Sequence, residues 1–207
     1  GRLSGRRRCP QSIRTRWLIN AAGLGSDHID RMLGFDRFTI TPRKGELLVF
    51  DKQSRPLARH IVLPVPSKAG KGVLISPTVY GNLMVGPTAQ DIADRTDTST
   101  TEAGFAFLRE KLAGLMPALL EEEVTATYAG LRAATEHADY VVDVDAARRY
   151  AVAGGIRSTG LTACMAIAEH VVDLVQGTGL LTMRERNGLP DPPSMPNLGE
   201  AFPRPYQ

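Results

Sequence analysis

The stretch 16–33, RWLINAAGLGSDHIDRML, constrains the fold of this chain more than any other part of its sequence. The apolar run from Trp17 to Ile19 is typical of a short buried strand, and it leads through alanines and glycines into a helical pattern. A strand that turns through small residues into a helix is the building unit of nucleotide-binding α/β domains. Because so little chain precedes this unit, we expect only a remnant of such a domain.

Neither glycine-rich segment of the chain matches a known phosphate-binding loop. After Gly23-x-Gly25, the dinucleotide fingerprint requires a third small residue so that helix and strand can pack closely, but that position holds His28. The segment GIRSTG, residues 155–160, lacks the Lys-Ser/Thr pair that follows the second glycine of a P-loop. It does connect the strand-like run YAVAGG to a helix. The N–H groups at that helix start suit a negatively polarised ligand atom, although a plain capped turn explains the same sequence.

Short β-type segments separated by turn residues fill most of the chain between these two units, which is typical of an antiparallel meander. We expect strands at 37–40, 46–51, 61–65, 72–76, 83–86, 124–131, 140–144 and 150–153. Gly81-Asn82 supplies the positive-φ positions of a hairpin turn.

Two amphipathic helices are expected. The first begins at Ser99, which has Glu102 in capping-box spacing, and it ends near Pro117. Its apolar stripe is Phe105, Leu108, Leu112, Leu115 and Leu119. The second covers 161–175, with Leu161, Met165, Ala168, Val172 and Val175 on its apolar face. Beyond Gly177, six prolines in a short polar segment predict an extended linker or tail.

Charge and cysteine content narrow the class of protein. The formal net charge of +3 owes much to six arginines between positions 2 and 16, and a solvated terminus explains this cluster better than a nucleic-acid site. Cys9 and Cys164 form neither a CxxC pair nor a cluster with histidines, so no disulfide framework or metal site is predicted and a reducing cytoplasm fits best. No apolar run approaches the roughly 18 residues of a membrane span, which leaves only peripheral membrane contact open.

Four basic residues in three segments are considered as candidates for a site. Arg132 follows the expected strand 124–131, where a guanidinium at a strand end can bind a carboxylate or phosphate; an ordinary solvated arginine fits equally well. His137 could act as an acid or base, although loop histidines are more common. Arg43 and Lys44 are expected in a charged turn before a strand.

In order and spacing, five stretches resemble the FAD-dependent oxidoreductases of the D-amino-acid-oxidase-like superfamily, over residues 16–176. They are LINAAGLGSDHID, PRKGELLVFD, LMVGPTAQDIADRTD, TYAGLRAATEHADYVV and AGGIRSTGLTACMAIAEHVVDL. Within the superfamily, the chain is most similar to the glycerol-3-phosphate dehydrogenase branch of the anaerobic large-subunit type and, next, to L-2-hydroxyglutarate oxidases.

The resemblance implies an α+β fold, in which an antiparallel-sheet substrate domain is joined to the rear part of a Rossmann-like FAD-binding domain. The FAD-binding parts would be 1–34 and 146–176, the substrate domain 35–145, and the linker 177–207. Family members begin with a GxGxxG portion that this chain lacks. We therefore expect a fragment that binds FAD weakly or not at all on its own, because the helix start that holds the pyrophosphate is missing.

The resemblance also implies roles for individual residues. The cofactor-binding residues would be Ala21, Ala22, Gly23, Gly154, Gly155, Ile156, Ser158, Thr159, Gly160, Leu161 and Thr162. The substrate-binding residues would be Lys44, Arg132 and Arg157, the catalytic residues Arg132 and His137, and no metal would take part. The implied reaction moves a hydride from an anionic hydroxy substrate to the flavin.

For the substrate, sn-glycerol 3-phosphate is the first candidate, and an electron-acceptor protein or quinone would be the partner. Alternatives are an L-2-hydroxyglutarate or amino-acid oxidase and, from another class, a flavin-free interaction module.

Overall fold

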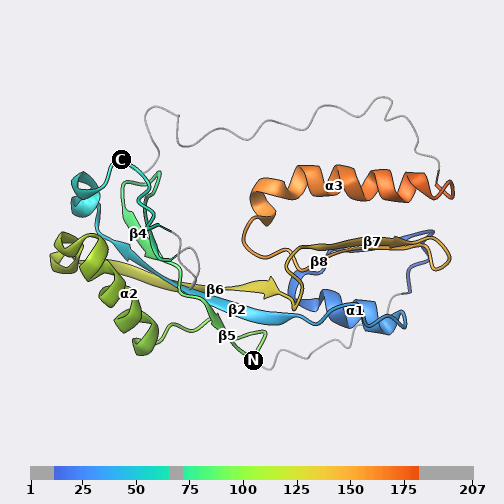
Figure 1. Ribbon diagram of the computed structural model, residues 1–207, viewed down its shortest axis with the longest axis horizontal. Helices are drawn as coiled ribbons and strands as arrows, with labels where there is room; N and C mark the ends of the chain where they lie inside the picture. Colours follow the sequence, from blue (N-terminus) through green and yellow to red (C-terminus); the bar gives the residue numbers. More distant parts are fainter. Residues whose placement is uncertain (1–11, 66–71, 182–207) are drawn as a thin grey trace, which may run out of the picture.

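The computed structural model describes residues 12–65 and 72–181, which form two sheets with no strand in common (Figure 1). The sequence-based expectations for Cys9, for most of the terminal arginines and for the prolines of the tail fall on residues outside this described part. Within it, no helix is both long and apolar enough to cross a bilayer.

The smaller sheet has the strand order β1-β8-β7, and a helix covers each of its faces (Figure 1). β1 (Leu18–Asn20) is parallel to β8 (Tyr150–Gly154), and β7 (Val141–Asp145) is antiparallel to β8. Side chains of β8 alternate between the faces, so Tyr150 and Val152 pack with the side of α1 (Ser26–Met32). Ala151 and Ala153 face α3 (Gly160–Gly177), where their small size allows close approach. Residues 141–145 thus belong to this sheet.

The larger sheet is antiparallel throughout and is built around β2 (Thr41–Phe50). β6 (Val124–Ala134) pairs along the whole of β2, while β4 (Leu83–Gly86) and β5 (Gln90–Asp91) pair with different parts of its other edge. β3 (Leu74–Pro77) extends the sheet beyond β4. One face packs against α2 (Glu102–Leu115) and two 3-10 helices, η2 (Lys52–Leu57) and η3 (Pro117–Glu121). The core there includes Leu48, Phe50, Ile75, Leu83, Leu108 and Leu112.

The end of the larger sheet continues directly into the core of the smaller one. Phe38, Ile40 and Ala133 are buried in one cluster with Tyr150 and Val152. The prediction of a strand at 37–40 is nevertheless wrong, because backbone N–H groups of this segment donate to carboxylates and not to a neighbouring strand. The N–H of Thr39 donates to Glu136, and that of Ile40 donates to the buried Asp27.

Two further expectations about element ends are corrected. The expected strand 61–65 is reduced to a single bridge between Val62 and Ile75. α2 is capped by Thr101, whose side chain accepts from the N–H of Gly104, and not by Ser99. The hydroxyl of Ser99 donates to Asp97, so its capping-box spacing with Glu102 is coincidental.

The apolar face of α3 also differs from the prediction. Val171 and Val175 are buried against β8, but only Val175 had been expected on the apolar face. Leu161 and Met165, expected on the packed face, are 93% and 72% exposed. The stripe predicted from spacing was therefore rotated away from the face that packs.

Candidate functional site

The two parallel strands of the smaller sheet end at the same edge of that sheet. Asn20 and Val152 are register partners, so β1 and β8 reach the same edge of the sheet. β1 leads into Ala21, Ala22 and Gly23, and β8 leads through residues 154–159 into α3. Gly23 adopts a φ of +54°, a conformation that side chains disfavour. Ligands of open α/β sheets bind at the carboxyl ends of such strands, so this edge is a candidate cofactor site.

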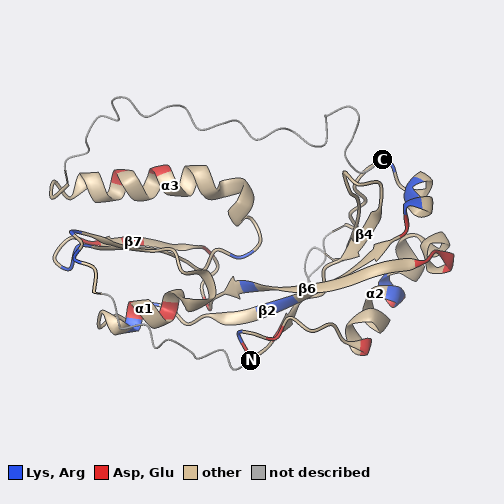
Figure 2. Cartoon of the chain, turned by 180° about the vertical axis from the view of Figure 1, so that it is seen from behind, with Lys and Arg blue, Asp and Glu red and all other residues tan. Residues whose placement is uncertain are grey.

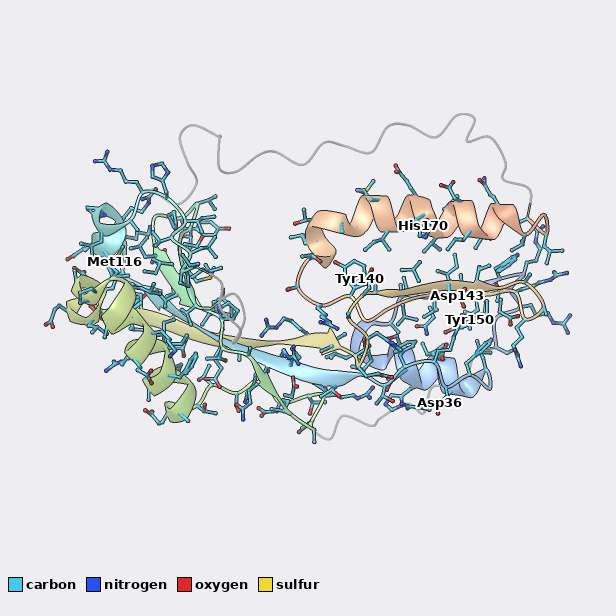
Figure 3. The ribbon with its side chains drawn as sticks, in the orientation of Figure 1. Asp36, Met116, Tyr140, Asp143, Tyr150 and His170 are labelled. Atoms are coloured by element: carbon cyan, nitrogen blue, oxygen red, sulfur yellow. The ribbon has the colours of Figure 1, made fainter. Side chains whose placement is uncertain are left out.

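The start of α3 leaves its first N–H groups without a side-chain cap. The N-cap residue, Thr159, makes no capping bond, because its hydroxyl is hydrogen bonded to the hydroxyl of Tyr140. Figure 3 shows Tyr140 beside the loop that opens this helix. Over 18 residues, the helix dipole favours negative charge at this end. The helix start therefore offers donors to a negatively polarised ligand atom.

Gly154 and Gly155 allow this turn to approach the larger sheet. A Cβ atom on Gly154 would lie 2.7 Å from Cζ of Phe38, which is too close for any real contact. Gly155 has a φ of +66°, and a Cβ there would lie 3.0 Å from Cγ2 of Thr135. Both glycines thus bring the end of β8 against the segment that follows β6.

A cleft of about 1170 Å³ opens where the two sheets meet. Among the residues that line it are Arg43, Arg132, Tyr140, Arg157, Ser158 and Thr159. It therefore brings the end of β6, the start of β2 and the start of α3 together. The basic residues of β2 and β6 lie near the middle of the molecule in Figure 2.

Arg132 lies within β6 and not after the strand, as the sequence suggested, because β6 extends to Ala134. Its Nη2 donates to the Thr88 carbonyl at 2.7 Å, and its Nε donates to the Arg43 carbonyl at 3.4 Å. Gly45 leaves room for it, since a Cβ there would lie 3.1 Å from Nη2. Among the described residues, no carboxylate forms an ion pair with Arg132.

Burial and the charge of Arg43 lower the pKa of Arg132, and Asp91 offsets part of this effect. An arginine stays protonated under such conditions, so the guanidinium is a partly buried cation that an anion would stabilise. Arg157 is similar. Its Nη2 bonds only to the carbonyls of Thr135 and His137, and no ion pair joins it to the described part of the chain.

Lys44 and Arg43 do not lie in a turn but inside β2, which corrects the expectation for both. Side chains alternate along a strand, so Lys44 points to the face opposite to the cleft. There its Nζ pairs with Asp97 at 2.9 Å, and its side chain is only 4% exposed. Arg43, to which the sequence analysis gave no binding role, lines the cleft. Leu48 lies in the core, and counting back from it in steps of two reaches Lys44 but not Arg43. This alternation would have placed the two residues on opposite faces of the sheet.

His137 is not brought into the cleft. Its Nε2 lies 2.9 Å from the carbonyl oxygen of Arg37, and about half of its side chain is exposed. Because a carbonyl can only accept, Nε2 must carry the proton in this arrangement. In the neutral ring, the basic nitrogen is then Nδ1.

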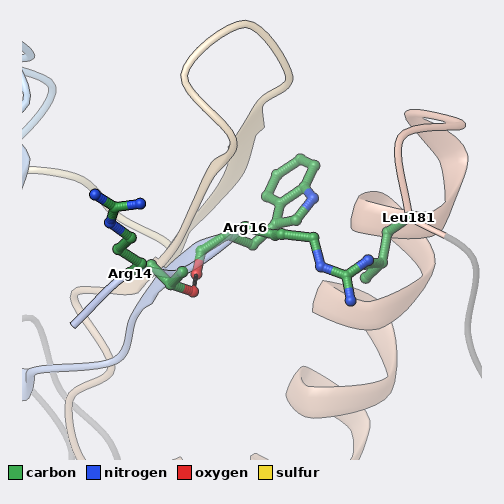
Figure 4. Close-up of a pocket in the computed structure, with 5 residues that line it drawn as sticks. Arg14, Arg16 and Leu181 are labelled. Atoms are coloured by element: carbon green, nitrogen blue, oxygen red, sulfur yellow. Dashed lines mark hydrogen bonds between the residues drawn. The ribbon is translucent and has the colours of Figure 1, made fainter.

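A second pocket lies at the opposite edge of the smaller sheet, before β1 and after α3 (Figure 4). It is lined by Arg14, Thr15, Arg16, Trp17 and Leu181. The indole Nε1 of Trp17 is buried there without a hydrogen-bond partner. None of the predicted site residues lies in this pocket. Within 12–65 and 72–181, no group of three or more acidic, histidine or cysteine side chains could hold a metal ion.

Residues 2–174 match the family described as FAD dependent oxidoreductase, or DAO. The chain belongs to this family. The match reaches back beyond residue 16, where the resemblance in the sequence began. For this DAO-family chain, the expected α+β fold with an antiparallel sheet is confirmed.

Relatives of the chain include a glycerol 3-phosphate dehydrogenase of Caloramator mitchellensis, 36% identical, with 90% of this chain and 39% of the relative covered. A glycerol 3-phosphate oxidase of Mycoplasma genitalium is 32% identical, with 79% and 43% covered. Among solved structures, the L-alpha-glycerophosphate oxidase of Mycoplasma pneumoniae with FAD bound has a TM-score of 0.68 at 30% identity, with 78% and 43% covered. This DAO-family chain therefore spans about two fifths of the length of these relatives.

Proposed function

We propose that this chain supplies the substrate site, and part of the cofactor site, of an FAD-dependent dehydrogenase that oxidises a small anionic hydroxy compound. The first candidate for that compound is sn-glycerol 3-phosphate. The observation that carries the proposal is Arg132, a partly buried guanidinium in the cleft that has carbonyl partners but no carboxylate partner among the described residues. A substrate anion would complete its hydrogen bonds.

The edge of the smaller sheet where β1 and β8 end fits FAD in two respects. The cofactor residues proposed from the resemblance all lie at the end of β8, on the two segments that follow β1 and β8, or at the start of α3. The uncapped N–H groups of α3 also suit the negatively polarised pyrimidine end of a flavin. When bound, FAD supplies the hydride acceptor, which no amino-acid side chain can provide.

The residues of the chain would then bind and orient the substrate. We propose that Arg132 grips the anionic group through its guanidinium and that Arg157, at the turn before α3, borders the other side of the cleft. Holding the reacting carbon beside the flavin lowers the barrier by proximity. We infer no substrate contact for Lys44, because it lies on the opposite face of the sheet.

The base that takes the hydroxyl proton is proposed to be His137, through Nδ1. Its ring would have to leave the Arg37 carbonyl and turn towards the cleft, since it does not border the cleft in this structure. A His137→Gln variant that keeps full turnover would remove it from the proposal.

The experiment that tests the function uses the full-length protein loaded with FAD. Anaerobic mixing with glycerol 3-phosphate should bleach the flavin absorbance, and Arg132→Ala should slow this bleaching at least about 100-fold, as expected when a charged hydrogen-bonded partner is lost. Arg109→Ala is the matched control, because Arg109 is exposed on α2. Bleaching by L-2-hydroxyglutarate alone would favour the oxidase alternative. A protein that takes up no flavin would contradict the proposal and favour an interaction module.

A further inference from the structure

We propose that Arg43, held in place by Asp91, selects a dianionic phosphate group over a carboxylate at this site. This inference rests on the proposed function, because it deepens the description of the same cleft. Arg43 would be a specificity-determining residue, and Asp91 a positioning residue that acts through it.

The three side chains stand in one row across the sheet. Asp91 of β5 and Arg132 of β6 are the register partners of Arg43, one on each side of β2. Directly opposed residues share a face, with Cβ atoms about 4.5–5.5 Å apart. The order across the three strands is therefore acid, base, base, and both arginines border the cleft.

Two like charges that are directly opposed on a sheet destabilise it. Of these two arginines, only Arg43 has a carboxylate partner among the described residues. The positive charge of Arg132 is therefore not compensated from within the row. Among the described residues that line the cleft, the one acid is Asp139, which follows β6 and whose carboxylate accepts from the N–H of Tyr140. A ligand with more than one negative charge would relieve the repulsion between the two arginines.

Asp91 fixes the direction in which Arg43 can bind. Its Oδ1 lies 2.6 Å from Nε, and its Oδ2 lies 3.0 Å from Nη2. This side-on pair occupies one edge of the planar guanidinium and leaves the Nη1 edge without a carboxylate. Asp91 thus fixes the orientation of the Arg43 guanidinium, while the second edge of that guanidinium remains available to a ligand.

The geometry distinguishes a phosphate from a carboxylate. A phosphate group offers three strong acceptor oxygens, so it can bridge the forks of Arg132 and Arg43 at once. A carboxylate has two oxygens, which a single fork such as that of Arg132 already satisfies. Removing Arg43 should therefore weaken phosphate binding and leave carboxylate binding nearly unchanged.

The test measures binding of inorganic phosphate and of acetate to the FAD-loaded, full-length protein by calorimetry, without turnover. For Arg43→Gln, we expect the Kd of phosphate to rise about tenfold or more and that of acetate to change less than about twofold. For Arg43→Lys, which keeps the charge but loses the planar guanidinium, the Kd of phosphate should lie between those of the native protein and Arg43→Gln. Arg109→Gln is the control, and thermal unfolding verifies that each variant is folded.

Asp91→Asn isolates the positioning role. We expect it to raise the Kd of phosphate about threefold in the native background and to have no added effect in the Arg43→Gln background, since its action passes through Arg43. With glycerol 3-phosphate as substrate, Arg43→Gln should raise KM far more than it lowers kcat. A merely structural ion pair would show neither the phosphate selectivity nor this split.

Three results would overturn the inference: no phosphate binding by the native protein, an unchanged phosphate Kd in Arg43→Gln, or equal weakening of phosphate and acetate. These results are independent of the proposed function, because ligand binding is measured without flavin reduction. If phosphate selectivity holds but glycerol 3-phosphate leaves the flavin oxidised, the proposed function fails and the dianion site stands.

Discussion

Arg95 and Asp27 join the two sheets through a two-pronged ion pair, in which Nη1 and Nη2 each lie 2.6 Å from a carboxylate oxygen. Asp27 belongs to α1 and is fully buried, whereas Arg95 comes from the segment between β5 and α2. The same guanidinium donates to the carbonyls of Leu24 and Ile40. The segment between β5 and α2 is thus bonded directly to the helix that covers the smaller sheet.

Arg95→Ala should lower the free energy of unfolding by about 3–5 kcal/mol, because it leaves the carboxylate of Asp27 buried without its main partner. Urea unfolding at neutral pH measures the change. Arg109→Ala, an exposed arginine of α2, should change it by less than about 0.5 kcal/mol. Equal effects of the two variants would show that the ion pair is not what holds the sheets together.

The pH dependence of stability should report the same carboxylate. Burial alone would raise the pKa of Asp27, but the hydrogen bonds of Arg95 and of the Ile40 N–H outweigh it and hold the pKa well below its usual range. A carboxyl group with a lowered pKa in the folded state stabilises the protein above the unfolded pKa of about 3.9. That stabilisation is lost as the pH falls further, towards the folded pKa.

Asp27→Asn should therefore be less stable than the native protein at pH 7 but lose less stability between about pH 5 and pH 2. Hydrogen bonds from Ser99 and Lys44 also lower the pKa of Asp97, to about 2, so some acid dependence remains in this variant. Unfolding midpoints in urea across this pH range give both slopes. Parallel curves for the two proteins would contradict the assignment.

Lys44→Met should leave the KM for the anionic substrate unchanged, in contrast to Arg43→Gln. The ammonium of Lys44 pairs with Asp97 on the face of β2 away from the cleft. Because Asp97 is partly exposed and can be solvated, we expect a stability loss of only about 1 kcal/mol. Steady-state kinetics and urea unfolding of the two variants, measured together, check this. A large KM effect in Lys44→Met would return that residue to the substrate site.

Gly154→Ala and Gly155→Ala should each destabilise the protein by about 2 kcal/mol or more, the first by its contact with Phe38 and the second through its positive φ. Gly114→Ala is the matched control, because a Cβ there meets open space on α2. That substitution should stabilise the protein by about 0.5–1 kcal/mol. Thermal unfolding distinguishes the opposite signs, and destabilisation by all three would refute the argument from packing.

The parts of the fold that could be predicted from the sequence are those governed by local pattern. The runs that became β1 and β8 carry their apolar residues and terminal glycines within a few positions, so both strand-to-helix turns were expected where they occur. Thr101 was missed as the cap of α2 because Ser99 offered the same local spacing. A contact with Asp97 decided between them, and spacing alone does not reveal that contact.

The site was harder to predict because its parts are distant in the chain. Arg132 was recognised from its own strand, but its position opposite Arg43, 89 positions away in the chain, depends on the register between β2 and β6. Asp27 and Arg95 are 68 positions apart, and no periodicity links them. His137 was selected for its nearness in sequence to Arg132, yet its ring turns to the carbonyl of Arg37.

The row of Asp91, Arg43 and Arg132 is set by backbone pairing of three strands, so its charges are brought together when the protein folds and not when a ligand arrives. The repulsion between the two guanidinium groups is offset by the folding free energy of the whole sheet, before any ligand binds. A dianion would then enter a site that needs no reorganisation and would remove a repulsion already present. The empty site would accordingly be the strained state of this protein, and ligand binding should raise its melting temperature.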